Sequence, residues 1–258
     1  MAPEHLSIHI DNALKKNRDL MPHVVGGRVS FRGILAFCRN YRIAGIATLF
    51  LTGTVDGFHR HLHRSGRAFL HHLQQQADAG GLRTSQSLPF FDAIGAGDFA
   101  SAAEIARRAR RTWAQDVEYE EDFLFVEFLM QHFFLGANEA HGEVMLQRYE
   151  NALQGAEDIR LDLCRSLLLV QEEDFNSALE RFLSERHDRF QELSDGQTVA
   201  DELLATEWNF SVEGLALVRL AERKGIPTEV DYLHVPSIAR ELPSALLAED
   251  SWTRPLEG

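Results

Sequence analysis

A histidine-rich segment is the first place in this sequence where reactive side chains gather. Five of the twelve histidines lie between residues 59 and 72 of the 258-residue chain. On an α-helix, Asp56, His59 and His63 share one face, because they are separated by three and four residues. One carboxylate and two imidazoles form a ligand set for zinc or iron. The spacing therefore offers a metal-dependent helical hydrolase as one hypothesis for the function.

The rest of the same segment argues against a metal site. The His-Glu-x-x-His pattern of metalloproteases is absent from it. Arg60, Arg64 and Arg67 lie on the same predicted helix and would repel a divalent cation. A basic helix surface fits these residues better, with histidines that pack against Phe58, Phe69 and nearby acids or contact a partner. We expect no metal and no other cofactor.

Other signatures of enzymes are missing as well. The sequence has no G-x-S-x-G nucleophile motif and no phosphate-binding loop. The run GAGD at residues 95–98 lacks the third glycine and the preceding strand of a dinucleotide-binding fingerprint. These observations favour a binding protein without catalytic residues over an enzyme.

A short acidic run is a candidate site of a different kind. Residues 116–122 carry five carboxylates in seven positions, with Trp113 before them and Tyr119 among them. A solvated loop is one interpretation, whereas a general acid and base would need a nucleophile or cofactor motif nearby. Charge beside an aromatic anchor is typical of protein docking sites. The predicted binding residues are Asp116, Glu118, Tyr119, Glu120, Glu121 and Asp122.

The charge of the chain is large and unevenly distributed. The formal net charge is −13 at pH 7. Residues 1–83 carry 11 Lys and Arg against 5 Asp and Glu, whereas residues 84–258 carry 15 against 34. An acidic surface repels nucleic acid and attracts basic partners, although it also serves solubility alone. We therefore expect a partner with a basic surface and no nucleic acid.

Cysteine content and hydropathy indicate the compartment. Cys38 and Cys164 lie inside apolar helical patterns, which predicts buried, reduced thiols. The first residues lack the apolar stretch of a secretion signal. The longest apolar run, residues 43–51, falls well short of the roughly 20 residues of a membrane-spanning helix. The prediction is a cytoplasmic protein without a membrane partner.

Apolar residues recur with the period of an α-helix along most of the chain. No segment shows the sustained alternation of apolar and polar residues that is typical of a β-strand. Long helices are predicted at residues 4–21, 29–52, 55–78, 98–111, 119–136, 139–154, 158–170, 172–194 and 198–224, with a short one at 89–97 and a last one from 236. Gly80 and Gly81 are expected to end the third helix. Short polar turns between the helices predict an all-α, compact multi-helix bundle of stacked αα-hairpins, solenoid-like in the C-terminal two thirds.

The stretch GGLRTSQS, near residue 83, combines glycine with short polar residues and coincides with the change of charge sign. It divides the chain into a basic N-terminal helical lobe, residues 1–83, and an acidic helical-hairpin lobe, residues 84–258. We expect both lobes to belong to one continuous domain.

The order of several segments resembles the immunity protein 49 family of bacterial polymorphic toxin systems, over residues 30–240. The similar segments are PFFDAIGAGDFASAAEIARRA, the D-x-E-Y-E-x-D-F stretch that precedes the apolar helix, Arg148-Tyr149-Glu150, RLDLCRSLL, ALERFLSERHDRFQEL, and EGLALVRLAERKGIPTEVDY followed by VPSIAR.

The resemblance implies a non-enzymatic protein that binds a cognate toxin and blocks it. It carries over no catalytic residue and no fixed contact positions, so the acidic run 116–122 is our candidate for the toxin-binding site. A cytoplasmic location and an acidic surface point to a toxin that acts in the cytoplasm, such as a nuclease with a basic cleft. A helical scaffold for peptide partners, the metal-dependent hydrolase and a homodimeric state stay open as alternatives.

Overall fold

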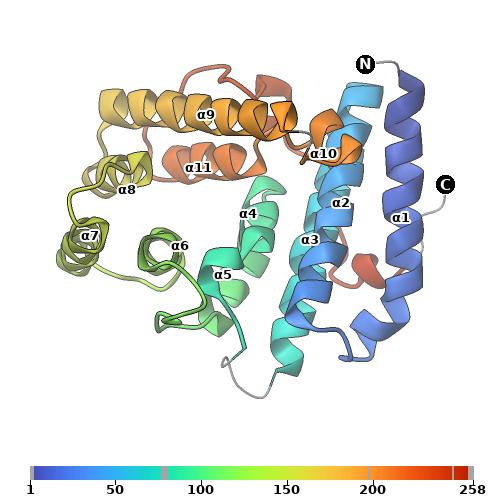
Figure 1. Cartoon of the computed structure of the whole chain (residues 1–258), viewed down its shortest axis with the longest axis horizontal. Coiled ribbons are helices and arrows are strands. Elements are labelled where there is room, and N and C mark those ends of the chain that lie inside the picture. Colours follow the sequence, from blue (N-terminus) through green and yellow to red (C-terminus); the bar gives the residue numbers. More distant parts are fainter. Residues whose placement is uncertain (1–2, 77–80, 197, 246, 255–258) are drawn as a thin grey trace.

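The structure is a computed structural model and describes residues 3–76, 81–196, 198–245 and 247–254. Eleven α-helices and three short 3-10 helices form within these ranges (Figure 1). Backbone pairing of the β type is limited, in the same ranges, to an isolated bridge between Tyr232 and Val235. The prediction of an all-α protein is confirmed.

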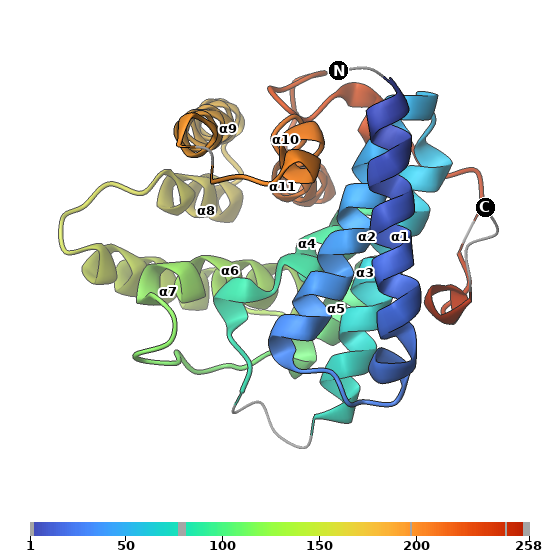
Figure 2. The same cartoon turned by 45° about the vertical axis from the view of Figure 1, so that its right-hand side comes forward.

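The first three helices lie side by side as a bundle (Figures 1 and 2). They are α1 (Pro3–Val25), α2 (Phe31–Thr52) and α3 (Val55–Gln75). Ser30 caps the start of α2 by accepting a hydrogen bond from the backbone N of Gly33 at 3.2 Å. Gly53 ends α2 in the left-handed region, at φ 64°, where glycine is the least strained residue.

α2 is the core helix of this bundle. Among the described helices, it is the one whose length and composition would suffice to cross a membrane. Within the fold, 67% of its most apolar 18-residue window is buried, and its neighbours are α1 and α3. The apolar run at residues 43–51 therefore lies inside the bundle, as the sequence predicts for a core helix.

The remaining helices pack beside this bundle and belong to residues 84–254. They are α4 (Leu88–Gly95), α5 (Phe99–Arg108), α6 (Glu120–Phe134), α7 (Glu139–Leu153), α8 (Ile159–Leu169), α9 (Glu172–Asp195), α10 (Asp201–Ala205) and α11 (Val212–Arg223), with 3-10 turns η1 (Thr84–Gln86), η2 (Ser237–Arg240) and η3 (Ser251–Thr253).

α6 pairs with α7 and α8 pairs with α9, as expected for αα-hairpins (Figure 2). α11 packs mainly on α4, which lies far earlier in the chain, and α4 packs on α3. Because these contacts join distant segments, the solenoid-like part of the prediction is not confirmed.

Two predicted helices differ from the structure. The helix expected at 198–224 is divided into α10 and α11, because Ser211 caps a new helix and accepts a hydrogen bond from the backbone N of Gly214 at 3.0 Å. The helix expected from residue 236 is only the turn η2, because Pro243 lacks a backbone N–H and disfavours helical backbone before it. α3 ends at Gln75, and Gly80 lies outside the described residues. The other long helices agree with the predicted ranges to within four residues.

One large cluster of buried side chains extends through both predicted lobes. It contains Phe58 and Leu62 from α3 together with Phe90 from α4 and Leu215 from α11. Gly66 makes the approach of α3 to α4 close, since a Cβ there would stand 2.9 Å from the Cβ of Ala93. The central helix α4 is thus enclosed by α2, α3, α5 and α11.

A buried ion pair crosses the same contact. Arg42 on α2 donates to both carboxylate oxygens of Asp92 on α4, at 2.6 and 2.8 Å. Ser65 on α3 donates a third hydrogen bond to Asp92 at 2.5 Å. Burial opposes the charge of Arg42, but Asp92 outweighs it and raises the pKa of the guanidinium. Three helices are therefore joined by one satisfied polar group in the core.

Candidate functional site: an acidic loop and a groove

The loop between α5 and α6 is fastened from within by Glu118. One oxygen of its carboxylate accepts hydrogen bonds from the backbone N and Oγ of Ser85, at 3.0 and 2.7 Å. The other oxygen accepts from the backbone N of Ala114 at 3.1 Å. Trp113 Nε1 donates to the carbonyl oxygen of Glu118 at 2.9 Å. These bonds give the acidic loop a defined shape on the surface.

Two further carboxylates of the acidic run join helices. Glu120 accepts hydrogen bonds from Arg148 on α7, at 2.8 and 2.6 Å. Asp122 accepts one from Arg160 on α8, at 2.7 Å. Both acids lie in the first turn of α6, where the helix dipole favours negative charge. Their main contacts in this structure hold α6 against its neighbours.

Of the other three predicted binding residues, Asp116 and Tyr119 are exposed and Glu121 is half-buried. Tyr119 is 74% exposed and its neighbour Val117 is 47% exposed. Asp116 is exposed and adopts a left-handed backbone with φ 70°. In the described part of the chain, Asp116 and Glu121 accept no hydrogen bond and form no ion pair. A hollow of about 780 Å³ lies beside these side chains and is lined by the loop, by Ser85 and by Gln154.

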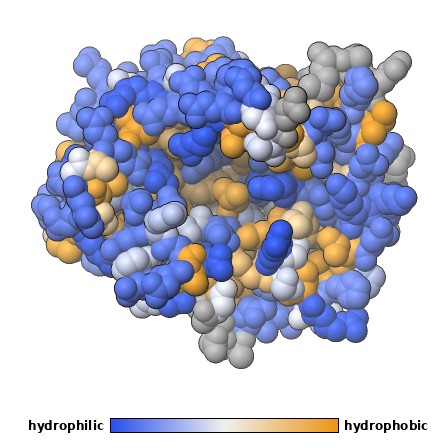
Figure 3. All heavy atoms as spheres, viewed as in Figure 1, coloured by the Kyte–Doolittle hydropathy of each residue, from blue (hydrophilic) through white to orange (hydrophobic). Residues whose placement is uncertain are grey.

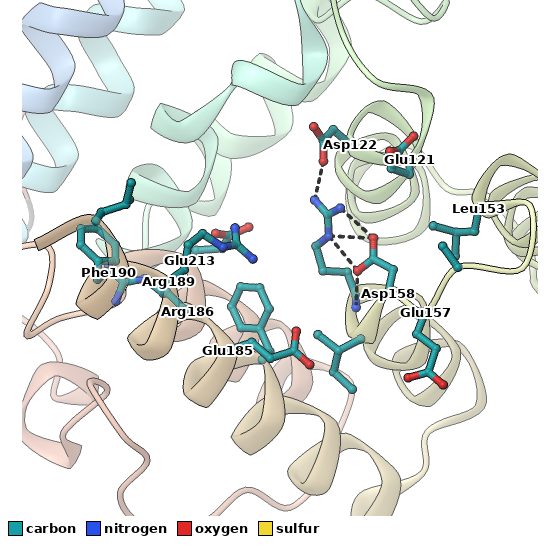
Figure 4. Close-up of a pocket in the computed structure, with 15 residues that line it drawn as sticks. Glu121, Asp122, Leu153, Glu157, Asp158, Glu185, Arg186, Arg189, Phe190 and Glu213 are labelled. Atoms are coloured by element: carbon teal, nitrogen blue, oxygen red, sulfur yellow. Dashed lines mark hydrogen bonds and ion pairs between the residues drawn. The ribbon is translucent and has the colours of Figure 1, made fainter. Parts of the chain in front are cut away.

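A second hollow opens on the other side of Glu121 and Asp122, which line both. This groove has a volume of about 540 Å³ and lies between the start of α6, the α7–α8 turn, α9 and α11 (Figure 4). Figure 3 shows this face of the molecule hollowed near its middle, with apolar atoms on the floor. The acidic loop and the groove therefore share one edge.

At one end of the groove, the acidic side chains form a hydrogen-bonded network with Arg160. Arg160 donates to Asp158 at 2.7 Å as well as to Asp122, and Tyr149 donates to Asp158 at 2.9 Å. Burial opposes ionisation of Asp158, but the hydrogen bonds and charge of Arg160 outweigh burial and lower the pKa of the carboxyl. Every acid in this network has a partner within the chain.

The other end of the groove contains an unpaired carboxylate (Figure 4). Glu213 on α11 is partly buried and, within the described residues, accepts no hydrogen bond and forms no ion pair. Burial raises the pKa of Glu213, although the charges of Arg160, Arg186 and other nearby arginines act in the opposite direction. An unpaired carboxylate at the floor of a hollow is available to a ligand.

The guanidinium of Arg186, beside Glu213, donates its hydrogen bonds to backbone carbonyl groups. It donates to the carbonyl oxygens of Glu207, Trp208 and Phe210, the last at 3.2 Å, and stacks on the ring of Phe190 at 4.7 Å. Burial lowers the pKa of Arg186. This arginine supports the turn between α10 and α11, so its hydrogen bonds are already used.

Comparison with known proteins places this arrangement in a family. The family model described as immunity protein 49 matches residues 49–238, which contain the acidic loop and most of the core. The chain belongs to the immunity protein 49 family. The resemblance seen in the sequence is confirmed. No curated protein and no solved structure matches the chain significantly. Membership implies an immunity protein that acts against a toxin, and it suggests a non-catalytic inhibitor role.

The histidine-rich helix of this immunity protein contacts its own C-terminal segment. Asp56 accepts hydrogen bonds from the backbone N and Oγ of Ser244, both at 2.7 Å. His59 Nε2 lies 2.9 Å from the carbonyl oxygen of Glu241. Burial lowers the pKa of His59 to about 4, so the ring is neutral and donates to that carbonyl.

His63, the third residue of the proposed metal set, has separate partners. Its Nδ1 lies 2.9 Å from Oδ2 of Asp98, and its Nε2 lies 3.3 Å from the carbonyl oxygen of Ala248. Within the described residues, no group of three His, Cys, Asp or Glu side chains gathers in a way that could hold a metal ion. The structure thus gives Asp56, His59 and His63 separate hydrogen-bond partners, which are Ser244, Glu241 and Ala248.

The groove residues Glu213, Glu185 and Glu157 are absent from the candidates chosen by sequence. Glu213 had one local signal, which is a charged residue beside Gly214 at the start of an apolar helix. Glu157 and Glu185 give no such signal, because they are exposed acids on a turn and on an acidic helix. Their convergence depends on the packing of α9 and α11 against the α7–α8 turn.

Proposed function

We propose that this immunity protein neutralises a nuclease-type toxin that acts in the cytoplasm, by covering a basic surface of it. The observation that carries the proposal is the set of Asp116, Tyr119 and Glu121 at the acidic loop. It combines an aromatic side chain that is 74% exposed with two carboxylates that have no partner in the described chain. Exposed aromatic anchors beside unpaired charge are the features that dominate protein interfaces.

Electrostatics supports a basic target. The acidic excess lies in residues 84–258, which carry 34 Asp and Glu against 15 Lys and Arg. Such a surface accelerates association with a positively charged partner and repels nucleic acid. A nuclease presents a basic phosphate-binding cleft, so an acidic protein complements it by charge.

The anchoring of the loop supports the same role. Glu118 and Trp113 hold the backbone around Tyr119 through hydrogen bonds of 2.7 to 3.1 Å. A loop that already has its bound shape loses less entropy on association, which favours tight binding. The role requires a rigid surface and no catalytic group, cofactor or membrane contact.

Both cysteines favour a reducing compartment. Cys38 and Cys164 are buried and unpaired, and burial raises the pKa of each thiol. Reduced, inert thiols suit the cytoplasm, which is where the proposed toxin would meet this protein.

Co-expression tests the proposal directly. The open reading frame beside the gene is expressed alone and together with this protein, and growth and complex formation are measured. We expect growth arrest from the neighbour alone, rescue by co-expression, and a stable complex whose mass gives the stoichiometry. An untagged, unrelated acidic helical protein of similar charge is the control, and it should not rescue. A neighbour that is harmless, or toxicity that persists with both proteins present, would overturn the proposal.

A further inference from the structure

The groove between α9, α11 and the α7–α8 turn is lined by more acidic than basic side chains, which a purely structural hollow does not require. Six acidic and three basic side chains line it. Glu121, Glu157, Glu185 and Glu213 accept no hydrogen bond and form no ion pair within the described residues. The three arginines do not balance six acids, and like charges in one hollow repel one another and destabilise the free protein.

The position of Glu213 makes the excess specific. Glu213 lies on the floor and is partly buried, whereas Glu157 and Glu185 are exposed on the rim. A buried carboxylate without a partner costs free energy that an incoming cation would recover. The unpaired floor acid, beneath a rim on which Glu157 and Glu185 outnumber Arg189, favours a positively charged visitor.

The walls suit a long basic side chain. Phe182, Phe190 and Leu153 give the groove an apolar lining beside its acids. Lysine and arginine carry an apolar stem and a charged tip, so they fill a site with apolar walls and an acidic floor. Leu193 on the rim is 44% exposed and extends the apolar contact outward.

We propose that the groove receives a lysine or arginine from a protruding segment of the toxin, and that Glu213 is its ion-pair partner. The inference rests on the proposed function, because it needs a basic toxin as the occupant. It also extends that function, since Glu121 and Asp122 line both the groove and the hollow beside Tyr119. The toxin contact would then run from Tyr119 across Glu121 to the floor of the groove.

Three variants and a binding assay test this. The toxin is purified as the complex, stripped in urea and refolded, and its affinity is measured for the wild type, Glu213→Gln, Glu185→Lys and Glu143→Lys. Glu143 is the matched control, because it is an exposed, unpaired acid on α7 that lines neither hollow.

We expect Glu213→Gln to weaken toxin affinity by about 30-fold or more, the effect of losing one desolvated charge pair. The urea midpoint of the free Glu213→Gln protein should equal or exceed that of the wild type, because an unpaired buried charge is removed. Glu185→Lys on the exposed rim should slow association several-fold, and more so at low salt. Glu143→Lys should leave affinity within about twofold.

Each outcome separates the groove from the wider proposal. Wild-type affinity in both Glu213→Gln and Glu185→Lys, with the toxin still bound, would overturn the groove contact and leave the immunity role standing. A lower urea midpoint for Glu213→Gln, with unchanged binding by Glu185→Lys, would assign Glu213 a structural role and likewise overturn the contact. A wild-type protein that does not bind the refolded toxin would overturn the proposed function itself.

Discussion

Glu118 accepts two hydrogen bonds from Ser85, one from its backbone N at 3.0 Å and one from its Oγ at 2.7 Å. The pair fastens the acidic loop to the turn η1, which lies 33 residues earlier in the chain. Neighbouring acids in one short run thereby acquire opposite roles. Glu118 shapes the loop, whereas the exposed Asp116 and the half-buried Glu121 have no partner among the described residues.

Removal of the Glu118 carboxylate should loosen the loop. Glu118→Ala leaves the backbone N–H groups of Ser85 and Ala114 without their acceptor, and it is expected to lower the free energy of unfolding by about 1–3 kcal/mol. Urea denaturation measures that change, and hydrogen exchange at Ser85 and Ala114 shows whether it is local. Glu121→Ala is the matched control and should stay within about 0.5 kcal/mol. Equal stability of the two variants would contradict the fastening role.

Asp116, Tyr119 and Glu121 should control toxin binding without affecting the fold. Tyr119→Ala is expected to weaken toxin affinity by about 2 kcal/mol, or roughly 30-fold, if the ring anchors the interface. Asp116→Lys and Glu121→Lys should mainly slow association, because exposed charges steer encounter. Surface plasmon resonance at two salt concentrations measures both effects.

Glu143→Lys on α7 reverses an exposed acid away from the loop and serves as the control. Its association rate should match that of the wild type to within about twofold, because one distant surface charge is largely screened. Unchanged affinity and growth rescue in Tyr119→Ala and in the Asp116→Lys, Glu121→Lys double variant would show that the toxin docks elsewhere.

The buried ion pair of Arg42 and Asp92 should be essential for the packing of α2 against α4. Asp92→Ala leaves the Arg42 guanidinium, which is 7% exposed, with only its longer contact to Glu207 at 3.6 Å. The expected loss is about 3–5 kcal/mol of the free energy of unfolding, the usual cost of breaking a buried pair. Guanidinium chloride denaturation measures it. Lys16→Ala breaks a surface pair with Glu202 and should cost less than about 1 kcal/mol. A similar loss in the two variants would show that Glu207 or water suffices to compensate the charge of Arg42.

Local sequence was sufficient to predict most of the helices. It was insufficient to predict which residues pair with the carboxylates of the acidic loop. Periodicity and capping residues such as Ser30 lie within a few positions of the helix they define, so they can be read along the chain. Glu120 and Asp122 look as exposed as Glu121 in sequence. Their partners Arg148 and Arg160 lie 28 and 38 residues away, so only the fold separates paired from unpaired acids.

The histidine-rich helix shows the same limit. The spacing of Asp56, His59 and His63 predicts one face of a helix, and all three lie on α3. Their hydrogen-bond partners Ser244, Glu241 and Ala248 lie more than 180 residues later in the chain. No local pattern in the sequence indicates that a C-terminal segment contacts this helix. Without those partners, the spacing of the three residues suggested a metal site.

Two buried histidines should make the protein sensitive to acid. Burial lowers the pKa of His59 to about 4 and that of His61 to about 3, with nearby arginines acting in the same direction. An unfolded histidine titrates near 6.5. Below about pH 6.5 these histidines bind protons in the unfolded chain but stay neutral in the folded protein. The free energy of unfolding therefore falls as the pH drops from about 6.5 toward 4.

The loss at pH 5 is expected to be about 2 kcal/mol for each of these histidines. Urea denaturation at pH 7.5 and pH 5.0 measures it. His61→Leu isolates one contribution, because leucine is of similar size and does not titrate. The fall in stability between the two pH values should be smaller in His61→Leu than in the wild type by about 2 kcal/mol. An identical fall in the two proteins would mean that His61 is already protonated, or exposed to water, in the folded state.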